Sequence, residues 1–192
     1  MVRTTTDLKD TILQKAGDLF AEQGYTATSN KQIAKAAGCT TAALYYYFEG
    51  GKAQILREVI HLYSRDLDHV FQAGKDVENL SELLIVLGRS VAQAMPEILR
   101  RISGLQPEFP HLSDTEKAAV QHLFVSLHEG ISALLTRFIE DQETLNHLSW
   151  LVLCAYFGYE QVFLKMEVNQ LAPFSMEAFT QTLASLVSKR TS

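Results

Sequence analysis

The chain has 192 residues, of which 47% are hydrophobic and 20% charged, so its composition is that of a folded globular protein and not of a disordered one. The formal net charge of −5 excludes a strongly basic surface over the whole molecule. The charge is uneven, because residues 1–67 hold eight Lys and Arg against seven Asp and Glu, whereas the rest of the chain holds nine against fifteen. A near-neutral start on an acidic remainder fits a small DNA-reading head.

The cysteines and the apolar runs indicate the compartment in which the protein is expected. Cys39 and Cys154 fit neither a disulfide framework nor a metal-ligand spacing, which indicates a reducing compartment. The N-terminus has no apolar segment of the kind found in secretory signals. The longest apolar run, residues 150–159, is well short of the roughly 18–20 residues that a membrane span needs. We therefore expect a cytoplasmic protein that does not enter a membrane.

Three short helices are predicted in the first fifty residues. Apolar residues recur at helical spacing over residues 7–23, and a glycine ends that helix. Ser29 and Gln32 have the spacing of a capping box at the start of the second helix. Thr40 is the expected N-cap of a third helix at 41–48, which ends in "EGG". Two short helices joined by a tight turn with glycine are typical of a helix-turn-helix.

The rest of the chain is predicted to form longer helices. Capping pairs at Asn79 with Glu82 and at Ser113 with Glu116 mark two of their starts. Pro96 is expected to open a separate short segment. The expected fold class is all-α, with a three-helix head, a C-terminal bundle and about nine helices. The longer helices are expected at residues 52–73, 80–95, 113–142, 144–167 and 175–189.

The aromatic run "LYYYF" at residues 44–48 indicates what the third helix does. At 100° per residue, Leu44 and Phe48 share one face and Tyr46 lies opposite them. Leu44 and Phe48 are therefore expected to be buried, and Tyr46 to point outward with Ala42. Small residues at a helix start let the backbone approach a DNA groove, and hydroxyl groups can bond phosphates and base edges. A single exposed tyrosine would need no explanation, but this set is typical of a recognition helix.

Residues 24–56, "GYTATSNKQIAKAAGCTTAALYYYFEGGKAQIL", resemble the N-terminal signature of the tetracycline-repressor (TetR) family of bacterial regulators. The turn after the third helix is one residue longer than usual. The departures within the signature are Asn30 for Val or Met, Cys39 for Val, Thr40 for Ser, and Ala42 for Gly. The matching positions are Gly24, Tyr25, Thr28, Ser29, Ile33, Ala34, Ala37, Gly38, Leu44, Tyr45, Tyr47 and Phe48.

The resemblance implies a ligand-responsive transcriptional regulator, most often a repressor, that binds a double-stranded DNA operator and needs no cofactor. It implies a helix-turn-helix DNA-binding domain at residues 6–66, with the motif at about 29–48, and a ligand-binding and dimerisation domain at 67–192. The DNA contacts that carry over by position are Thr28, Lys31, Thr40, Thr41, Ala42, Tyr45, Tyr46, Tyr47 and Lys52.

The body is predicted to form a homodimer, because the helix at 148–164 is apolar almost all round and must be covered on both sides. A central core helix of a monomer is the alternative. The predicted interface residues are Leu151, Tyr159, Val162, Phe163, Phe179, Leu183 and Leu186.

The resemblance also implies an effector pocket among the middle helices. Its apolar lining favours a small hydrophobic or aromatic effector. The candidate lining residues are Tyr63, Leu67, Leu84, Leu87, Met95, Leu99, Phe124, Leu127, His128, Phe138, Trp150 and Phe157.

Other functions have weaker support in the sequence. The six histidines are scattered, and no motif with metal-ligand spacing occurs, so no metal site is expected. The glycine-rich and nucleophile motifs of common enzyme classes are absent as well. The remaining alternative is a helical protein that binds a small molecule or a partner without reading DNA.

Overall fold

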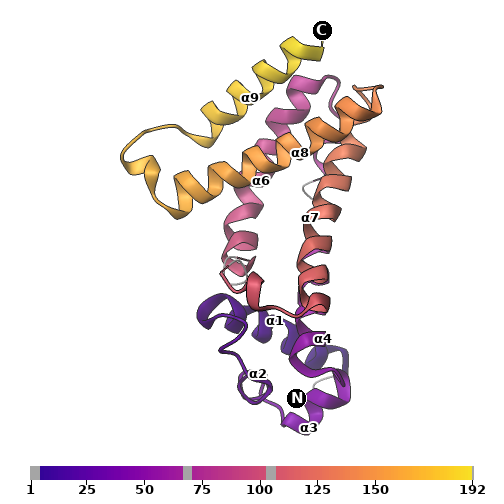
Figure 1. The fold of residues 1–192 in the computed structure, drawn as a ribbon, viewed down its shortest axis with the longest axis vertical. Helices are drawn as coiled ribbons and strands as arrows, with labels where there is room; N and C mark the ends of the chain where they lie inside the picture. Colours follow the sequence, from indigo (N-terminus) through magenta and orange to yellow (C-terminus); the bar gives the residue numbers. More distant parts are fainter. Residues whose placement is uncertain (1–4, 67–70, 103–106, 192) are drawn as a thin grey trace. The chain divides into compact units, whose positions relative to one another are not determined.

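The structure is a computed structural model that describes residues 5–66, 71–102 and 107–191, and all regular structure in these ranges is helical (Figure 1). The predicted all-α class is therefore confirmed. Short 3-10 helices lie at Phe109–His111 and Val168–Gln170, and a π-helix lies at Glu160–Lys165. The α-helices are α1 (Thr5–Gln23), α2 (Asn30–Ala36), α3 (Thr41–Tyr47), α4 (Gly51–Asp66), α6 (Leu80–Ile102), α7 (Asp114–Leu135), α8 (Gln142–Tyr159) and α9 (Met176–Thr191).

The chain folds into two compact units. One combines residues 1–65 with 97–123, and the other combines 66–96 with 124–192. The first unit thus contains the predicted head together with a segment from the middle of the chain. The division of the chain into a DNA-binding domain at 6–66 and a second domain at 67–192 stays a prediction.

The predicted helix starts in the first unit are confirmed by their capping hydrogen bonds. The Ser29 amide donates to Oε1 of Gln32 at 2.8 Å, and the Gln32 amide donates back to the Ser29 hydroxyl at 3.2 Å. At the start of α3 the Ala43 amide donates to Oγ1 of Thr40 at 3.1 Å. These bonds satisfy amide groups that a helix start leaves without partners.

The core of the first unit collects the apolar stripes of α1 to α4. An ion pair between Lys9 and Glu58, 2.7 Å apart, joins α1 to α4 at the surface. The Gln54 side chain donates to Glu58 at 3.0 Å and accepts from the Gly50 amide at 3.0 Å, which ties the turn before α4 to that helix. The most deeply buried large side chains of these helices are Ile12, Phe20, Ile33, Leu44, Phe48, Ile55 and Leu56.

The second unit has a core of its own, built by α6, α8, α9 and the part of α7 from residue 124. The guanidinium of Arg137 donates to the backbone oxygens of Gly74 and Val77 and so fixes the turn before α6. Core residues of this unit are Val77, Leu80, Leu83, Leu84, Leu87, Ile131, Leu134, Leu135, Ile139, Leu145, Leu148, Val152, Tyr156, Ala184 and Val187.

Gly88 allows a close approach between helices in the second unit. A Cβ at this position of α6 would lie 2.7 Å from the Tyr156 hydroxyl and would collide with the Thr180 side chain. Gly158 on α8 is the opposite case, because a Cβ there would meet nothing within 4 Å.

Three predicted helix boundaries are wrong. The helix expected at 80–95 continues through Pro96 as α6, because a proline inside a helix removes one backbone hydrogen bond and need not end the helix. The helix expected at 113–142 is α7 and ends at Leu135, and Asp141 then caps α8 by accepting from the Thr144 amide at 2.8 Å. The helix expected at 144–167 widens into the π-helix after Tyr159. For the helix expected at 52–73, residues 67–70 lie outside the described residues.

Candidate nucleic-acid interface

Helix α3 separates its aromatic residues as its helical angles predict. Leu44 and Phe48 are fully buried, whereas Tyr46 is 79% exposed and Tyr45 is 43% exposed. The rings of Tyr46 and Tyr47 meet edge to face with their centroids 5.2 Å apart. One short helix therefore anchors the motif with two residues and presents tyrosines on its outer side.

Small and basic residues surround these tyrosines on the surface of α2 and α3. Lys31, Thr40 and Ala42 are exposed, and Thr41 is half-buried. The Thr40 oxygen accepts the capping bond from Ala43, so its hydroxyl proton is not used by that bond. Seven of the sequence-predicted residues thus lie on α2, on α3 and at the N-cap of α3: Lys31, Thr40, Thr41, Ala42, Tyr45, Tyr46 and Tyr47.

Thr28 is placed differently from these residues. It is only 2% exposed, its hydroxyl donates to the backbone oxygen of Gly24 at 2.7 Å, and its oxygen accepts from the Gln23 side chain at 3.0 Å. This hydroxyl closes the turn between α1 and α2. The structure gives it partners within the protein.

Lys52 also has partners within the protein. Its Nζ donates to the backbone oxygen of Tyr25 at 2.8 Å and lies 4.2 Å from the centre of the Tyr25 ring. Burial lowers the pKa of Lys52, while the charges of Glu116 and Glu108 act in the opposite direction. The ammonium group therefore supports the turn between α1 and α2 from the first turn of α4.

The same turn is bonded to a segment far along the chain. The Tyr25 hydroxyl donates to Oε1 of Glu116, a side chain that is only 9% exposed. Oε2 of Glu116 accepts from the amide and the hydroxyl of Ser113, both at 2.8 Å. The predicted capping pair of Ser113 and Glu116 is therefore confirmed, and the same carboxylate also receives a tyrosine from the head.

The electrostatics of this pair follow from burial and hydrogen bonding. Burial and the bond to Glu116 raise the pKa of Tyr25. Burial alone would raise the pKa of Glu116, but the hydrogen bonds from Tyr25 and Ser113 and the charge of Lys52 outweigh it and lower that pKa. Glu116 is thus held ionised and Tyr25 is held protonated at neutral pH.

A second carboxylate contacts the turn on its other side. Oε2 of Glu108 accepts from the Thr26 amide at 2.6 Å and from the Thr26 hydroxyl at 3.0 Å. Gly24 has a φ of 87°, and a Cβ there would collide with the Glu108 carboxylate. Sequence reasoning missed the roles of Glu108 and Glu116, because residues more than 80 positions apart carry no local signal of their pairing.

The predicted effector-pocket residues fall into several groups. Leu84 and Leu87 belong to the core of the second unit, and Phe138 packs against that core. Four others form ring pairs between α7 and α8: Phe124 meets Phe157 edge to face at 5.7 Å, and His128 stacks on Trp150 at 4.4 Å. Nε2 of His128 is buried and has no hydrogen-bond partner in the described part of the chain. Leu127 is half-buried, and the side chains of Tyr63, Leu67, Met95 and Leu99 lie outside the described residues.

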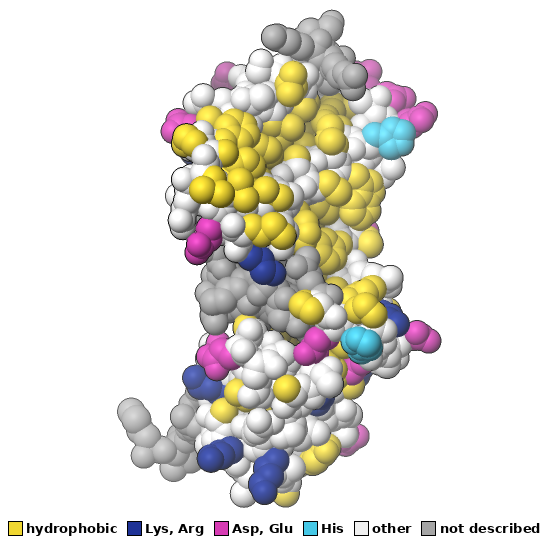
Figure 2. Space-filling view, turned by 60° about the vertical axis from the view of Figure 1, so that its left-hand side comes forward, with side chains coloured by type: hydrophobic (Ala, Val, Ile, Leu, Met, Phe, Trp, Pro, Cys, Tyr) yellow, Lys and Arg dark blue, Asp and Glu magenta, His cyan; other side chains and the backbone are white. Residues whose placement is uncertain are grey.

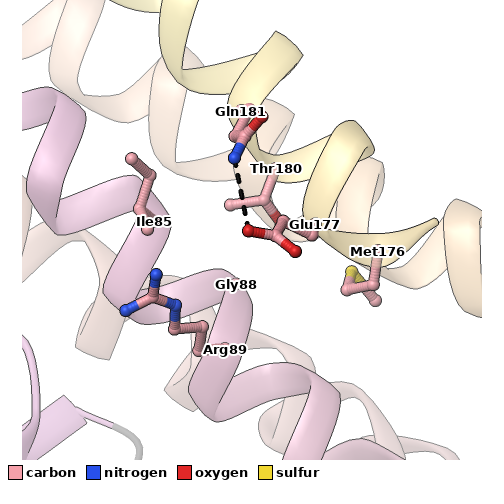
Figure 3. Close-up of a pocket in the computed structure, with 7 residues that line it drawn as sticks. All are labelled: Ile85, Gly88, Arg89, Met176, Glu177, Thr180 and Gln181. Carbon is pink, nitrogen blue, oxygen red and sulfur yellow. Dashed lines mark hydrogen bonds between the residues drawn. The ribbon is translucent and has the colours of Figure 1, made fainter.

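A small cavity of about 250 Å³ lies elsewhere in the second unit, between α6 and α9 (Figure 3). A hydrogen bond of 3.4 Å joins Gln181 to Glu177 at this site. None of the predicted pocket residues contributes to it. Its lining residues are Ile85, Gly88, Arg89, Met176, Glu177, Thr180 and Gln181.

The predicted dimer residues divide into exposed and internal ones. Leu151, Val162 and Leu186 are 55%, 42% and 61% exposed. Figure 2 shows hydrophobic side chains gathered over the unit that carries α8 and α9. Tyr159 is buried and donates to the backbone oxygen of Phe174 at 2.6 Å. The other members, Phe163, Phe179 and Leu183, are half-buried, and the two phenylalanines share a ring cluster with Tyr159 and Phe174.

Within the described ranges, no group of His, Cys, Asp and Glu side chains is arranged to hold a metal ion. None of the described helices is long and apolar enough to cross a bilayer. The two cysteines are both free.

Two short crossing helices, an anchored α3 and an outward set of tyrosines define the chain as a helix-turn-helix protein. The profile described as "Bacterial regulatory proteins, tetR family" matches residues 12–59. The chain belongs to this TetR family, as the sequence resemblance indicated.

Two related regulators are similar to this chain in sequence. The chain is 31% identical over 136 residues to the HTH-type transcriptional regulator AcrR of Shigella flexneri, covering 67% of this chain and 63% of AcrR. It is 34% identical over 70 residues to the HTH-type regulator YxaF of Bacillus subtilis, covering 36% and 37% of the two chains. The match therefore spans less than two thirds of the length of either relative.

A solved structure covers nearly the whole chain. The TetR family regulator PfmR from Thermus thermophilus has a TM-score of 0.67 and 25% identity, covering 97% of this chain and 96% of PfmR. These related proteins are all named transcriptional regulators.

Proposed function

We propose that this chain is a cytoplasmic, ligand-responsive transcriptional repressor that binds a near-palindromic operator as a dimer and is released by a small, largely apolar effector. The observation that carries the proposal is the outer side of α3, where Tyr46 is 79% exposed on a helix that Leu44 and Phe48 anchor. Its relatives support it, because AcrR is named a transcriptional regulator and two KstR2 proteins are named transcriptional repressors.

The proposed DNA contacts come from α2 and α3. The exposed Lys31 supplies a charge for the phosphate backbone, which adds affinity without sequence information. Threonine and tyrosine hydroxyls supply bonds to phosphates and base edges. Thr28 and Lys52 support the turn that precedes the motif, as their internal bonds indicate. The contact set is Lys31, Thr40, Thr41, Ala42, Tyr45, Tyr46 and Tyr47.

The proposed dimer uses the exposed apolar residues of α8, of the π-helix and of α9. Leu151, Val162 and Leu186 are large apolar side chains that are each more than 40% exposed in a single chain. Tyr159, Phe163 and Phe179 stabilise this surface from beneath through their ring contacts. A dimer is also what a palindromic operator requires, since one head reads one half-site.

The proposed effector is a small, largely apolar or aromatic molecule that contacts the ring pairs of α7 and α8. The stacked pair of His128 and Trp150 offers aromatic surface, and no described residue is a hydrogen-bond partner of the buried Nε2 of His128. An effector that binds there with a preference for the DNA-free state would release the operator.

Footprinting on the DNA upstream of the chain's own gene and of neighbouring genes tests the proposal. We expect protection of a near-palindrome whose half-sites lie one or more helical turns apart, and loss of protection with Tyr46→Ala at unchanged circular dichroism. Light scattering at micromolar concentration should give twice the mass of the chain. Absence of any protected site would favour a helical binding protein that does not read DNA.

A further inference from the structure

The amide of Asn30 holds the hydroxyl of a tyrosine on the recognition helix. Nδ2 of Asn30, the first residue of α2, donates to the Tyr45 hydroxyl oxygen at 2.9 Å. Tyr45 is 43% exposed on the outer side of α3. A polar bond thus joins the two helices of the motif at the edge of the proposed DNA-binding surface.

Gly51 lies next to the hydrogen-bonded side chains of Asn30 and Tyr45. It is buried, has a φ of 57° and begins α4. A Cβ at Gly51 would lie 2.9 Å from Nδ2 of Asn30 and 3.1 Å from Cε1 of Tyr45. The Asn30 amide and the Tyr45 ring therefore occupy the space that a side chain at position 51 would need, where α4 starts.

The direction of the bond determines what the hydroxyl can still do. A tyrosine hydroxyl has one proton to donate and an oxygen that accepts. Nδ2 of Asn30 uses the accepting side, and the hydroxyl has no other hydrogen bond among the described residues. The proton of Tyr45 therefore remains available for an acceptor outside the protein.

We propose that Asn30 is a positioning residue that orients the Tyr45 hydroxyl to donate its proton to a phosphate oxygen of the operator. This inference rests on the proposed DNA-binding function. Phosphate oxygens on DNA carry negative charge and only accept, so they complement a hydroxyl whose accepting side is already occupied.

The amide is retained at a cost in stability. Oδ1 of Asn30 is buried and has no hydrogen-bond partner among the residues that the structure describes, and an unsatisfied buried acceptor destabilises the folded state. An apolar side chain of similar size would remove that cost and would also release Tyr45. Stability and operator affinity should therefore change in opposite directions when Asn30 is replaced.

The experiment is a double-mutant cycle with Asn30→Val and Tyr45→Phe, measured on the labelled promoter duplex that the footprint identifies. Because a hydrogen bond to a charged group is lost, Tyr45→Phe should weaken binding about tenfold. Asn30→Val should weaken it by less while raising the melting temperature, and the double variant should bind within about twofold of Tyr45→Phe. The slope of affinity against salt should stay unchanged in all three, because no charge is removed.

Asn146→Val, an exposed position on α8, is the matched control and should bind as the wild type does. Two results overturn the inference. The first is that Asn30→Val binds the duplex as tightly as the wild type does. The second is that Asn30→Val weakens binding by the same factor in the Tyr45→Phe background as in the wild type, because Asn30 would then not act through Tyr45. If the wild type itself binds no promoter duplex, the inference falls together with the proposed function. The wild-type titration separates this failure from the other two.

Discussion

Removing the Tyr25 hydroxyl should destabilise the first unit measurably. Tyr25→Phe keeps the ring that lies under the Lys52 ammonium but leaves Oε1 of Glu116 without its donor. Tyr25 is 6% exposed and Glu116 is 9% exposed, so water replaces the lost bond poorly. A hydrogen bond to a charged group contributes about 1.5–3 kcal/mol, and we expect a loss of about 2 kcal/mol in the free energy of unfolding.

Urea unfolding followed by circular dichroism, at one fixed protein concentration, measures this loss. With a slope of about 2 kcal/mol per molar urea, the midpoint should fall by about 1 M. The variant Glu116→Gln keeps an acceptor for the tyrosine but turns an NH2 group toward the Ser113 amide, which also donates, so its loss should be at least as large. A midpoint shift below about 0.2 M for Tyr25→Phe would refute the reasoning, because the bond would then contribute nothing beyond what water supplies.

The difference in unfolding free energy between wild type and Tyr25→Phe should also depend on pH, which gives a second measurement. Hydrogen bonds hold the pKa of Glu116 below its ordinary value despite the opposing effect of burial. A carboxyl whose folded pKa is depressed stabilises the protein above its unfolded pKa of about 4.3 and loses that contribution as the pH falls through the folded value. The gap between wild type and Tyr25→Phe should therefore be full at pH 7 and shrink below about pH 4. A gap that is constant across this range would contradict the assignment.

Three further predictions concern other positions. Gly88→Ala should destabilise by about 1–3 kcal/mol in thermal unfolding, because its Cβ meets two hydroxyl groups on facing helices. Gly158→Ala, whose Cβ meets nothing within 4 Å, is the control and should not destabilise the single chain. Lys52→Met should lower stability and leave the slope of operator affinity against salt unchanged. Lys31→Met should reduce that slope by about 1 per half-site. Equal slopes for the two variants would contradict the assignment of Lys31 and not Lys52 to phosphate. Arg137→Lys should cost about 1 kcal/mol in urea unfolding, because an ammonium group cannot reach both backbone oxygens as the guanidinium does; an unchanged midpoint would show that one bond is enough.

Much of the head was predictable because its signals are local. The capping bonds of Ser29 with Gln32 and of Thr40 depend on residues three positions apart. The burial of Leu44 and Phe48 follows from the helical repeat alone. A short motif of this kind can be predicted from sequence, because its contacts join residues that lie only a few positions apart.

The boundaries of the longer helices were harder to predict. Pro96 is expected to end a helix, but α6 continues through it, since a proline removes only one backbone hydrogen bond. The end of α7 was missed because Asp141 reads equally well as a residue of a charged helix face and as the N-cap of α8. Tertiary packing decides such cases, and a single sequence does not display it.

The polar contacts around the motif were beyond sequence reasoning. Asn30 stood out as a departure from the usual apolar residue, yet its bond to Tyr45 depends on how two helices cross. Lys52 was assigned to phosphate from its position, and the structure gives it the Tyr25 backbone oxygen as a partner. Only the folded arrangement reveals which polar groups already have partners.

The bonds that Glu108 and Glu116 make with the turn after α1 mean that the reading head is not a detachable module. A fragment that stops at residue 66 would keep every residue of the motif but would leave both carboxylates behind. Tyr25 would lose the acceptor for its buried hydroxyl, and the Thr26 amide would lose its partner. Transplanting this head onto another body would therefore require residues 108–116, or substitutes for these two side chains, to travel with it.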